Sequence, residues 1–270
     1  MKNIIILGSS GKLGLEIVDY LKDKNKIFTD ASINIEKILS MDFINENNIN
    51  CIINCVGSTK KREYFFHSNF LFTSYLSEKL KEFDLNLKRQ FTFIHMSTIG
   101  VNAPYMKYNF KELVFNPFKK QFIKYNSYEL SKSCGEYNLR TNLKNLKNIK
   151  IIILQPSIII FKKSIFLKKL NIFLTIFPLR VSKNRQLPIT PIEFLLKEIS
   201  EIISSYYKNT IDIKKIYKRE RVYNLFKNYS CISFLKIKIP LYFLKKIINS
   251  LPEIYFIKSL KRIIIFTFIL

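Results

Sequence analysis

Five short apolar runs recur along the first 156 residues, and longer stretches with apolar residues at helical spacing lie between them. The runs are "NIIIL", "KIFTD", "CIINCVG", "QFTFIHMS" and "IKIIILQP", which begin at residues 3, 26, 51, 90 and 149. Runs of this kind predict strands buried on both faces of a parallel sheet. Because predicted helices separate the strands, we expect a doubly wound α/β fold, whose ligands bind beyond the carboxyl ends of the strands.

The segments between these runs have the spacing of amphipathic helices. Apolar residues recur at helical intervals across residues 12–24. Further helices are predicted over residues 36–47, 68–83 and 128–143. The regular alternation of strand and helix is typical of parallel β–α–β units.

The alternation of strand-like and helix-like segments ends after Pro156. Residues 157–270 combine apolar and basic segments with repeated prolines, and they contain one strand-like stretch, "RVYNLF", at residues 221–226. We therefore expect a first domain over residues 1–160 and a smaller, mainly helical lobe over residues 161–270. The proline breaks in the second part fall at Pro178, Pro188, Pro191, Pro240 and Pro252.

A glycine turn stands directly between the first predicted strand and the first predicted helix, in "IIILGSSGKLGLEI". In its G-x-x-G-x-x-G spacing, the first glycine permits a tight turn, the second lets the backbone approach a pyrophosphate, and the third lets helix and strand pack closely. Glycine turns also end strands for structural reasons alone, but the strand and helix on either side favour dinucleotide binding. The residues that would line the cofactor are Gly8, Ser10, Gly11, Lys12, Leu13 and Gly14.

The end of the second predicted strand bears on the choice of cofactor. Asp30 follows the glycine turn by about 20 residues, where an acid accepts hydrogen bonds from the adenosine ribose. An aspartate at this place can also have a purely structural role, in a turn or beside a helix end. Lys12, inside the glycine turn, would instead favour a 2′-phosphate. The choice between NAD and NADP is therefore open.

The composition is strongly basic, with 45 Lys and Arg against 20 Asp and Glu and a formal net charge of +25. The lysines are spread through nearly every segment together with Ile, Asn and Phe, which indicates compositional bias, so we expect no nucleic-acid partner. No metal site is expected, because the four cysteines and two histidines lack metal-ligand spacing. These residues are Cys51, Cys55, Cys134, Cys231, His67 and His95.

The expected compartment is the cytoplasm. The first residues enter a strand too soon for a secretory signal, and no apolar run reaches the roughly 18 residues that span a bilayer. Residues 161–183 and 242–270 mix aromatic and aliphatic residues with Lys and Arg. Such helices can lie at a membrane surface or can be core helices with snorkelling lysines. Peripheral contact at the inner face of the membrane is therefore left open.

With the glycine turn near its start and Tyr128-x-x-x-Lys132 near its middle, the chain resembles the extended short-chain dehydrogenase/reductase superfamily. Within that superfamily it is most similar to NAD-dependent epimerases, dehydratases and sugar-nucleotide reductases. The resemblance covers about residues 1–160. It implies a Rossmann-type NAD(P)-binding domain there, a substrate-binding lobe over residues 161–270, NAD or NADP as cofactor, a nucleotide-sugar substrate and a homodimer.

The same resemblance assigns roles to single residues. In "HMSTIGV" it places the active-site hydroxyl at Thr98, with Ser97 beside it. It makes Tyr128 and Lys132 the proton-transfer pair, so that the catalytic residues are Thr98, Tyr128 and Lys132. Beyond the glycine turn and Asp30, it lines the cofactor groove with Asn54, Cys55, Val56, Gly57, Asn69, Tyr128, Lys132 and Pro156.

The family chemistry moves a hydride between nicotinamide and a sugar carbon while a proton moves to or from the attached oxygen. A tyrosine has a pKa of about 10, so Tyr128 needs a stabilised anion to act near neutral pH. Lys132 is one helical turn away on the same face, and its charge favours the phenolate. Thr98 would orient the substrate oxygen through a hydrogen bond.

Some positions depart from the family pattern. Gln155 stands where arginine is common, and Asn34 with Ile35 stands where an acid and an apolar residue usually contact adenine. A Tyr-x-x-x-Lys match also arises easily in a chain with 15 tyrosines. Three hypotheses follow. The chain is an epimerase, dehydratase or 4-keto reductase, a non-catalytic NAD(P)-binding scaffold or sensor, or a basic membrane or nucleic-acid adaptor in which the glycine turn is incidental. The order of glycine turn, strand-end hydroxyls and tyrosine–lysine helix favours the enzyme.

Overall fold

The computed structural model describes residues 1–58, 62–87, 89–102, 127–161, 186–205 and 211–221. The chain divides into two compact units, the first made of residues 1–157 and 193–216 and the second of residues 158–192 and 217–270. Apart from Phe161, the basic stretches at residues 161–183 and 242–270 lie outside the described residues, as does most of "RVYNLF".

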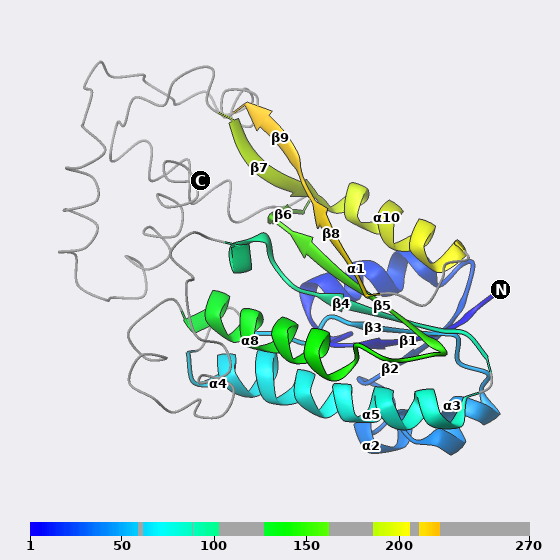
Figure 1. The fold of residues 1–270 in the computed structure, drawn as a ribbon. Helices are drawn as coiled ribbons and strands as arrows, with labels where there is room; N and C mark the ends of the chain where they lie inside the picture. The colour runs from blue at the N-terminus through cyan, green and yellow to red at the C-terminus, as the bar shows by residue number, and fades with distance from the viewer. Residues whose placement is uncertain (59–61, 88, 103–126, 162–185, 206–210, 222–270) are drawn as a thin grey trace, which may run out of the picture. The chain divides into compact units, whose positions relative to one another are not determined.

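The first unit is built on a parallel six-stranded sheet in the order β2-β1-β3-β4-β5-β8 (Figure 1). The strand order reverses at β1, which pairs with β2 on one side and β3 on the other. This is the predicted Rossmann-type doubly wound sheet, and β8 brings its sixth strand from well beyond residue 160. The strands are β1 (Asn3–Leu7), β2 (Lys26–Thr29), β3 (Cys51–Asn54), β4 (Phe91–Met96), β5 (Ile149–Pro156) and β8 (Ile211–Ile216).

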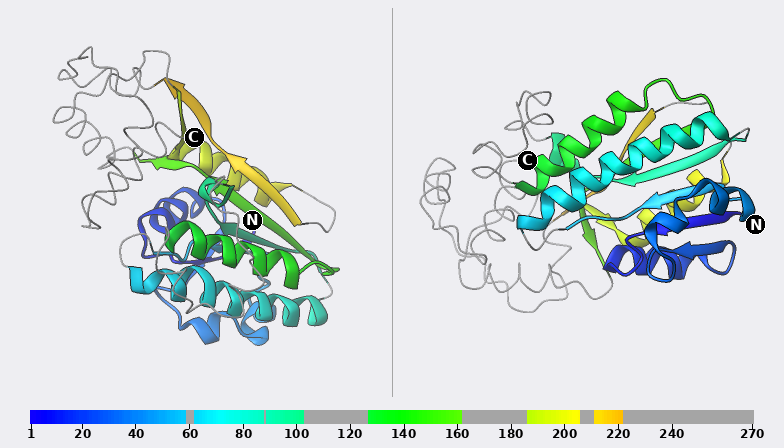
Figure 2. Two further views of the ribbon diagram at one scale, coloured as in Figure 1. Left: turned by 60° about the vertical axis from the view of Figure 1, so that its left-hand side comes forward. Right: turned by 90° about the horizontal axis from the view of Figure 1, so that it is seen from below.

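Helices cover both faces of this sheet (Figures 1 and 2). Helices α5 (Phe72–Asn86) and α8 (Ser127–Asn142), together with the short α2 (Ile35–Ile38) and α3 (Met41–Glu46), lie on one face. Helices α1 (Lys12–Leu21) and α10 (Ile192–Ser204) lie on the other face. Every residue of β3 and β5 is buried, as strands covered on both sides require.

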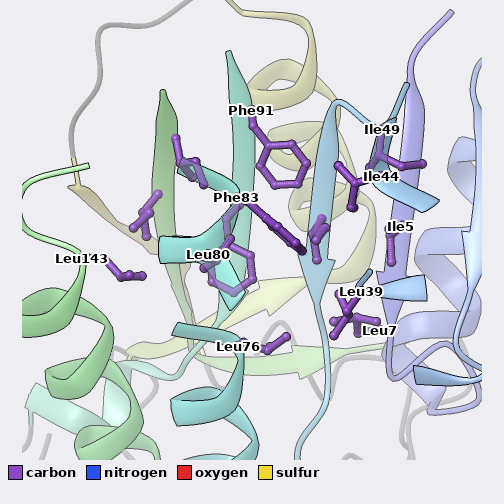
Figure 3. Close-up of a cluster of buried hydrophobic side chains, with 14 of the residues drawn as sticks. Ile5, Leu7, Leu39, Ile44, Ile49, Leu76, Leu80, Phe83, Phe91 and Leu143 are labelled. Atoms are coloured by element: carbon purple, nitrogen blue, oxygen red, sulfur yellow. The ribbon is translucent and has the colours of Figure 1, made fainter. Parts of the chain in front are cut away.

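The main apolar core lies between the sheet and α5 (Figure 3). Leu76, Leu80 and Phe83 of α5 face the strands, and the Phe83 ring meets Phe91 of β4 edge-on, with 6.1 Å between ring centroids. Full burial of one such side chain contributes roughly 1.5 to 3 kcal/mol. The same periodicity that predicts the helix thus fixes which face it packs on the sheet.

Two helices differ from the prediction in their boundaries. The segment expected as one helix over residues 36–47 is split into α2 and α3, because the Ser40 side chain accepts a hydrogen bond from the Phe43 N–H at 3.2 Å and begins a second helix. The helix expected over residues 68–83 is preceded by α4 (Arg62–Phe66) and by a π-helical turn, η1 (His67–Leu71), so α5 begins at Phe72.

The second unit contains a three-stranded sheet in the order β6-β7-β9. Strand β6 (Ile158–Ile160) is parallel to β7 (Gln186–Pro191), and β9 (Lys218–Arg221) is antiparallel to β7. What the structure describes of this unit is therefore mostly strand. Of the mainly helical lobe predicted over residues 161–270, the structure describes α10 and β8, which belong to the first unit, and the strands β7 and β9. Across the described ranges, no helix has the length and apolar character needed to cross a membrane.

Candidate active site

The glycine turn joins β1 to α1 in a conformation that needs its glycines. Gly8 has a φ of +77°, and a Cβ added there would lie 2.7 Å from the backbone N of Val56. A Cβ on Gly14 would lie 2.2 Å from the carbonyl oxygen of Gly8, so α1 packs directly against the turn. The N-cap residue of α1 is Gly11, which has no side chain to cap the helix. The helix therefore begins with backbone N–H groups suited to an anion.

Asp30 is tied to the glycine turn. Its Oδ2 accepts a hydrogen bond from the Gly8 N–H at 2.7 Å, and its Oδ1 accepts from the Ser9 N–H at 3.0 Å and the Ser9 hydroxyl at 2.5 Å. The register of β1 with β2 explains this contact, because Ile6 pairs with Thr29 and the next residues of both strands run side by side. Asp30 thus anchors the glycine turn, which specifies the turn role that the sequence left open, and its contact with a ribose stays a prediction.

The loop after β3 lies against the glycine turn. The Cys55 N–H donates to the Leu7 carbonyl at 2.9 Å, and the Val56 N–H donates to Oδ1 of Asn54 at 3.0 Å. Burial raises the pKa of the Cys55 thiol to about 12, so the thiol stays neutral at physiological pH. We call Cys55–Gly57 the β3 loop. Two of its residues predicted to line a cofactor groove, Cys55 and Val56, lie beside Gly8.

Asn69 lies in the π-helical turn η1 and is fully buried. Its Nδ2 donates to the Ser131 hydroxyl at 3.0 Å, while its Oδ1 has no hydrogen-bond partner among the described residues. A Cβ on Gly135 would lie 2.4 Å from the Asn69 carbonyl oxygen, so α8 crosses η1 in close contact. Single π-helical turns frequently occur at functional sites. The sequence motif predicts Asn69 as a cofactor residue but gives no signal for the π-helical turn that holds it.

Lys132 of α8 is 4 % exposed and reaches the carboxyl ends of β3 and β4. Its Nζ donates to the Met96 carbonyl at 2.9 Å and to the Val56 carbonyl at 3.5 Å. A Cβ on Gly57 would lie 2.9 Å from this Nζ and 2.8 Å from Oδ1 of Asn69, so the three groups meet at one point. Burial lowers the pKa of Lys132 to about 8. The side chain therefore remains mostly protonated at pH 7.

Tyr128 lies one helical turn before Lys132 and is partly exposed. Its ring meets Phe65 of α4 edge-on, with 5.8 Å between centroids and 70° between the planes. Such a contact restricts the orientation of the phenol. Phe65 therefore helps to hold the ring, and Tyr128 lies on the face of α8 that carries Lys132.

The two hydroxyls after β4 have different partners. The Ser97 hydroxyl donates to Oε2 of Glu136 at 2.9 Å, whereas Oγ1 of Thr98 accepts from the Gly100 N–H at 3.3 Å. Of these two hydroxyls, only that of Ser97 donates a hydrogen bond to a partner among the described residues. Thr98 keeps a donor for a ligand, which is consistent with the prediction that it, and not Ser97, contacts the substrate oxygen.

A buried polar network lies beside these hydroxyls and was not predicted. Nε2 of Gln155 donates to both oxygens of the Glu136 carboxylate, at 2.9 and 2.8 Å, and Oε1 of Gln155 accepts from Asn102 at 2.7 Å. Glu136 is only 5 % exposed. Gln155, noted in the sequence as a departure from arginine, thus satisfies the carboxylate through neutral hydrogen bonds. The available signal was the spacing of Glu136, one turn after Lys132.

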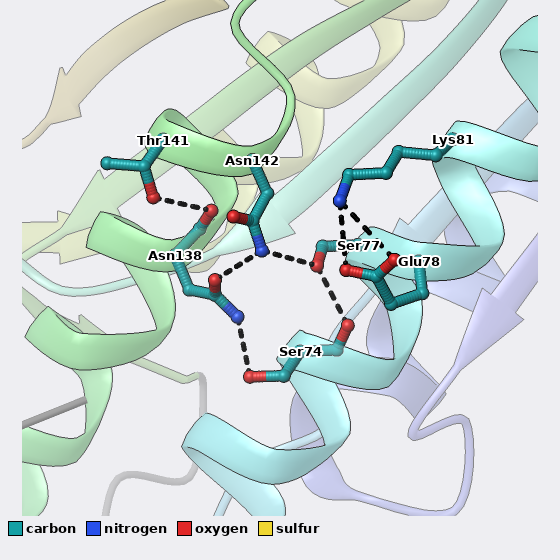
Figure 4. A network of polar contacts seen from close by, with 7 residues as sticks. All are labelled: Ser74, Ser77, Glu78, Lys81, Asn138, Thr141 and Asn142. Carbon is teal, nitrogen blue, oxygen red and sulfur yellow. Dashed lines mark hydrogen bonds and ion pairs between the residues drawn. The ribbon is translucent and has the colours of Figure 1, made fainter. Parts of the chain in front are cut away.

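Side-chain amides fix α8 against α5 (Figure 4). Asn138 Nδ2 donates to the Ser74 hydroxyl at 2.6 Å, and Asn142 Nδ2 donates to the Ser77 hydroxyl at 3.3 Å and to Oδ1 of Asn138 at 2.5 Å. The helix that carries Lys132 is therefore held in rotation as well as in position.

The remaining predicted residues lie at the same edge of the sheet. Ser10 and Lys12 are exposed at the turn and at the start of α1, Leu13 is partly buried, and Pro156 ends β5. No cluster of three or more His, Cys, Asp or Glu side chains that could hold a metal is found in the parts of the chain described.

Fold and site together define a Rossmann-type α/β protein in which a glycine turn, a buried lysine and strand-end hydroxyls meet at the carboxyl edge of the sheet. No protein-family model and no curated protein sequence matches the chain. Solved structures do match its fold.

One similar structure is the dTDP-4-dehydrorhamnose reductase of Bacillus anthracis in complex with NADP, with a TM-score of 0.56, 16 % identity and coverage of 98 % of both chains. Another is the UDP-glucuronic acid 4-epimerase of Bacillus cereus in complex with NAD, with a TM-score of 0.55, 16 % identity and coverage of 81 % of this chain and 78 % of that one. The enzyme WbmG of Bordetella bronchiseptica in complex with NAD has a TM-score of 0.57 at 9 % identity, over 88 % of this chain and 81 % of that one. At these identities the likeness shows the fold, and the neighbours are of the kind that the sequence resembles.

Proposed function

We propose that this chain is an NAD(P)-dependent oxidoreductase or epimerase acting on a nucleotide-activated sugar. The observation that carries the proposal is the position of Lys132, whose ammonium is held at the ends of β3 and β4 one turn from Tyr128. Structures with the same fold include a UDP-glucuronic acid 4-epimerase with NAD and a dTDP-4-dehydrorhamnose reductase with NADP. These neighbours support the substrate class.

The residues present fit a dinucleotide. The glycine turn leaves no room for side chains at Gly8 and Gly14, and α1 begins without a side-chain cap. Oδ1 of Asn69 is a buried acceptor that lacks a partner within the described residues, beside Lys132. We propose that residues 10–13 hold the pyrophosphate and that the β3 loop and Lys132 line the nicotinamide end. When bound, NAD or NADP would supply or accept the hydride.

The protein's own groups would then move the proton. Tyr128 gives a proton to the sugar oxygen or takes one from it. The Lys132 ammonium favours the phenolate, and its effect is strengthened because the group is buried. Thr98 donates a hydrogen bond from its hydroxyl to the same oxygen, keeps its proton, and stabilises negative charge that develops there.

The other parts of the proposal concern the rest of the chain. We propose that residues 1–160 bind the cofactor and that residues 161–270 supply most substrate contacts. A homodimer, a cytoplasmic location and contact with the inner face of a membrane through the basic segments stay predictions.

A panel of UDP- and dTDP-linked sugars and 4-keto sugars, assayed by cofactor absorbance, tests the proposal. Tyr128→Phe should lower kcat at least about a hundredfold while the thermal shift with NAD(H) or NADP(H) persists. Tyr137→Phe changes a tyrosine on the same helix and serves as the matched control. Turnover that is equal in wild type and Tyr128→Phe would contradict the assigned role, and cofactor binding without turnover of any sugar would favour a scaffold or sensor.

A further inference from the structure

His95 occupies an unusual place for a histidine. It lies in β4 with a side chain that is 0 % exposed, and its ring stacks on Phe93 at 6.4 Å between centroids and 21° between planes. In the register of the sheet, His95 is the direct partner of Asn54, the last residue of β3. The two side chains meet, with 3.1 Å between Nδ1 of His95 and Nδ2 of Asn54.

The hydrogen bonds around Asn54 fix the proton on the imidazole. Oδ1 of Asn54 accepts from the Val56 N–H, and a backbone N–H can only donate, so the amide orientation is determined. Nδ2 of Asn54 therefore faces His95 and can only donate. Nδ1 of His95 must accept, which leaves its proton on Nε2 and the ring neutral.

The environment keeps the ring in this form. Burial, and to a smaller extent the charge of Lys132, lowers the pKa of His95 well below its ordinary value of 6.5. Protonation at Nδ1 would also set one N–H group against another. His95 is therefore an acceptor at physiological pH and not a second cation in the site.

A packing role alone does not account for this residue. Nε2 of His95 has no hydrogen-bond partner among the described residues, although it is buried and carries the proton. An unsatisfied buried N–H is unfavourable, and an apolar side chain would fill the same space without it. What only the imidazole supplies here is the acceptor Nδ1.

The acceptor acts at one end of a short chain of contacts. His95 orients Asn54, Asn54 holds the Val56 N–H, and the Val56 carbonyl lies 3.5 Å from Nζ of Lys132. We infer that His95 is a positioning residue that, as a neutral acceptor, fixes the β3 loop and through it the Lys132 ammonium. A role for His95 in cofactor binding rests on the function proposed above. The hydrogen bonds between His95, Asn54 and the β3 loop do not depend on that function.

The first test reads the tautomer in the wild-type protein. Nitrogen-15 NMR of the imidazole at pH 7 should show a protonated Nε2 and an unprotonated Nδ1 for His95. A proton on Nδ1, or a charged ring, would overturn the inference. This measurement needs neither a variant nor a cofactor.

The second test compares His95→Leu with His95→Asn, which places a carbonyl oxygen where Nδ1 lies. Amide hydrogen exchange of Val56 should become about tenfold faster in His95→Leu and stay within about threefold of wild type in His95→Asn. Exchange of Ile152, a buried residue of β5 in the same sheet, is the internal control. Unchanged exchange of Val56 in a folded His95→Leu variant would refute the positioning role.

The same variants separate this inference from the proposed function. We expect the dissociation constant of NADH or NADPH to rise about tenfold in His95→Leu and to recover in His95→Asn. Equal affinity in His95→Leu and wild type would contradict the link to the cofactor groove. Failure of wild type to bind any cofactor would instead contradict the proposed function, and the tautomer and exchange results would still decide the role of His95.

Discussion

Replacing Lys132 should change how the stability of the protein depends on pH. The ammonium is 4 % exposed, and burial lowers its pKa from 10.5 to about 8. The charged form is therefore disfavoured in the folded state by roughly 3 kcal/mol relative to the unfolded chain. This cost is fully present below pH 8 and disappears as the pH rises toward 10.5.

The sign follows from proton binding. Between pH 8 and 10.5 the unfolded chain binds more protons at this lysine than the folded chain, so the free energy of unfolding rises with pH. From pH 7 to pH 10 the contribution of Lys132 amounts to roughly 2 to 3 kcal/mol. Lys132→Met lacks this contribution, so its stability should rise less over the same range.

Urea unfolding of wild type and Lys132→Met at several pH values between 7 and 10 measures the difference. Groups that titrate in both proteins contribute equally to the two pH dependences and cancel in the comparison. Lys150 is one of them, and burial lowers its pKa to about 8 as well. Lys144→Met, at an exposed lysine, should follow wild type. The same pH dependence in Lys132→Met and wild type would show that the ammonium is not desolvated, and the structural reasoning would fail.

Four further predictions rest on single charges, close contacts and hydrogen bonds in the structure. Turnover by the proposed enzyme should fall above about pH 8, as Lys132 loses the charge that favours the phenolate, which a pH–rate profile would show. Gly135→Ala should lower the free energy of unfolding by about 1 to 3 kcal/mol, because its Cβ would meet the carbonyl of Asn69; urea denaturation measures this. Asp30→Asn should lower the free energy of unfolding by about 1 to 3 kcal/mol in the same assay, because one amide nitrogen would face an N–H of the glycine turn. An unchanged free energy of unfolding would contradict the anchoring role. Asp84→Ala, in α5, should lower the free energy of unfolding by at least about 2 kcal/mol in the same assay. The Asp84 carboxylate accepts hydrogen bonds from the backbone N–H groups of residues 147–149, where the chain enters β5.

The central strands of the parallel sheet could be predicted because β1, β3, β4 and β5 are short apolar runs that are mostly buried. Strand β8 alternates charged and apolar residues and is largely half-buried or exposed, so it gave no such signal. Strand β5 occupies the predicted residues 149–156, and β1 the predicted residues 3–7. Helix boundaries were harder, because they depend on single side chains and not on periodicity. Ser40 divides one predicted helix, and the π-helical turn at His67–Leu71 gives no periodic signal.

The candidate site divides in the same way. Residue types at motif spacing led to Lys132, which the fold brings to the β3 loop and Asn69. The partners of these residues could not be predicted, because they come from strand register and buried hydrogen bonding. His95 meets Asn54 because the register of β3 and β4 pairs these two residues. Gln155 of β5 meets Glu136 only because α8 packs beside that strand.

The hydrogen bonds of Asp30 constrain any attempt to redesign cofactor preference. Replacing this acid to admit a 2′-phosphate would also remove the acceptor of the Gly8 and Ser9 N–H groups. In the proposed enzyme, the loop assigned to the phosphates would then loosen, and affinity would fall for both cofactors before selectivity changed. A successful exchange therefore requires at least two substitutions, one to bind the added phosphate and another to supply a new acceptor for the turn.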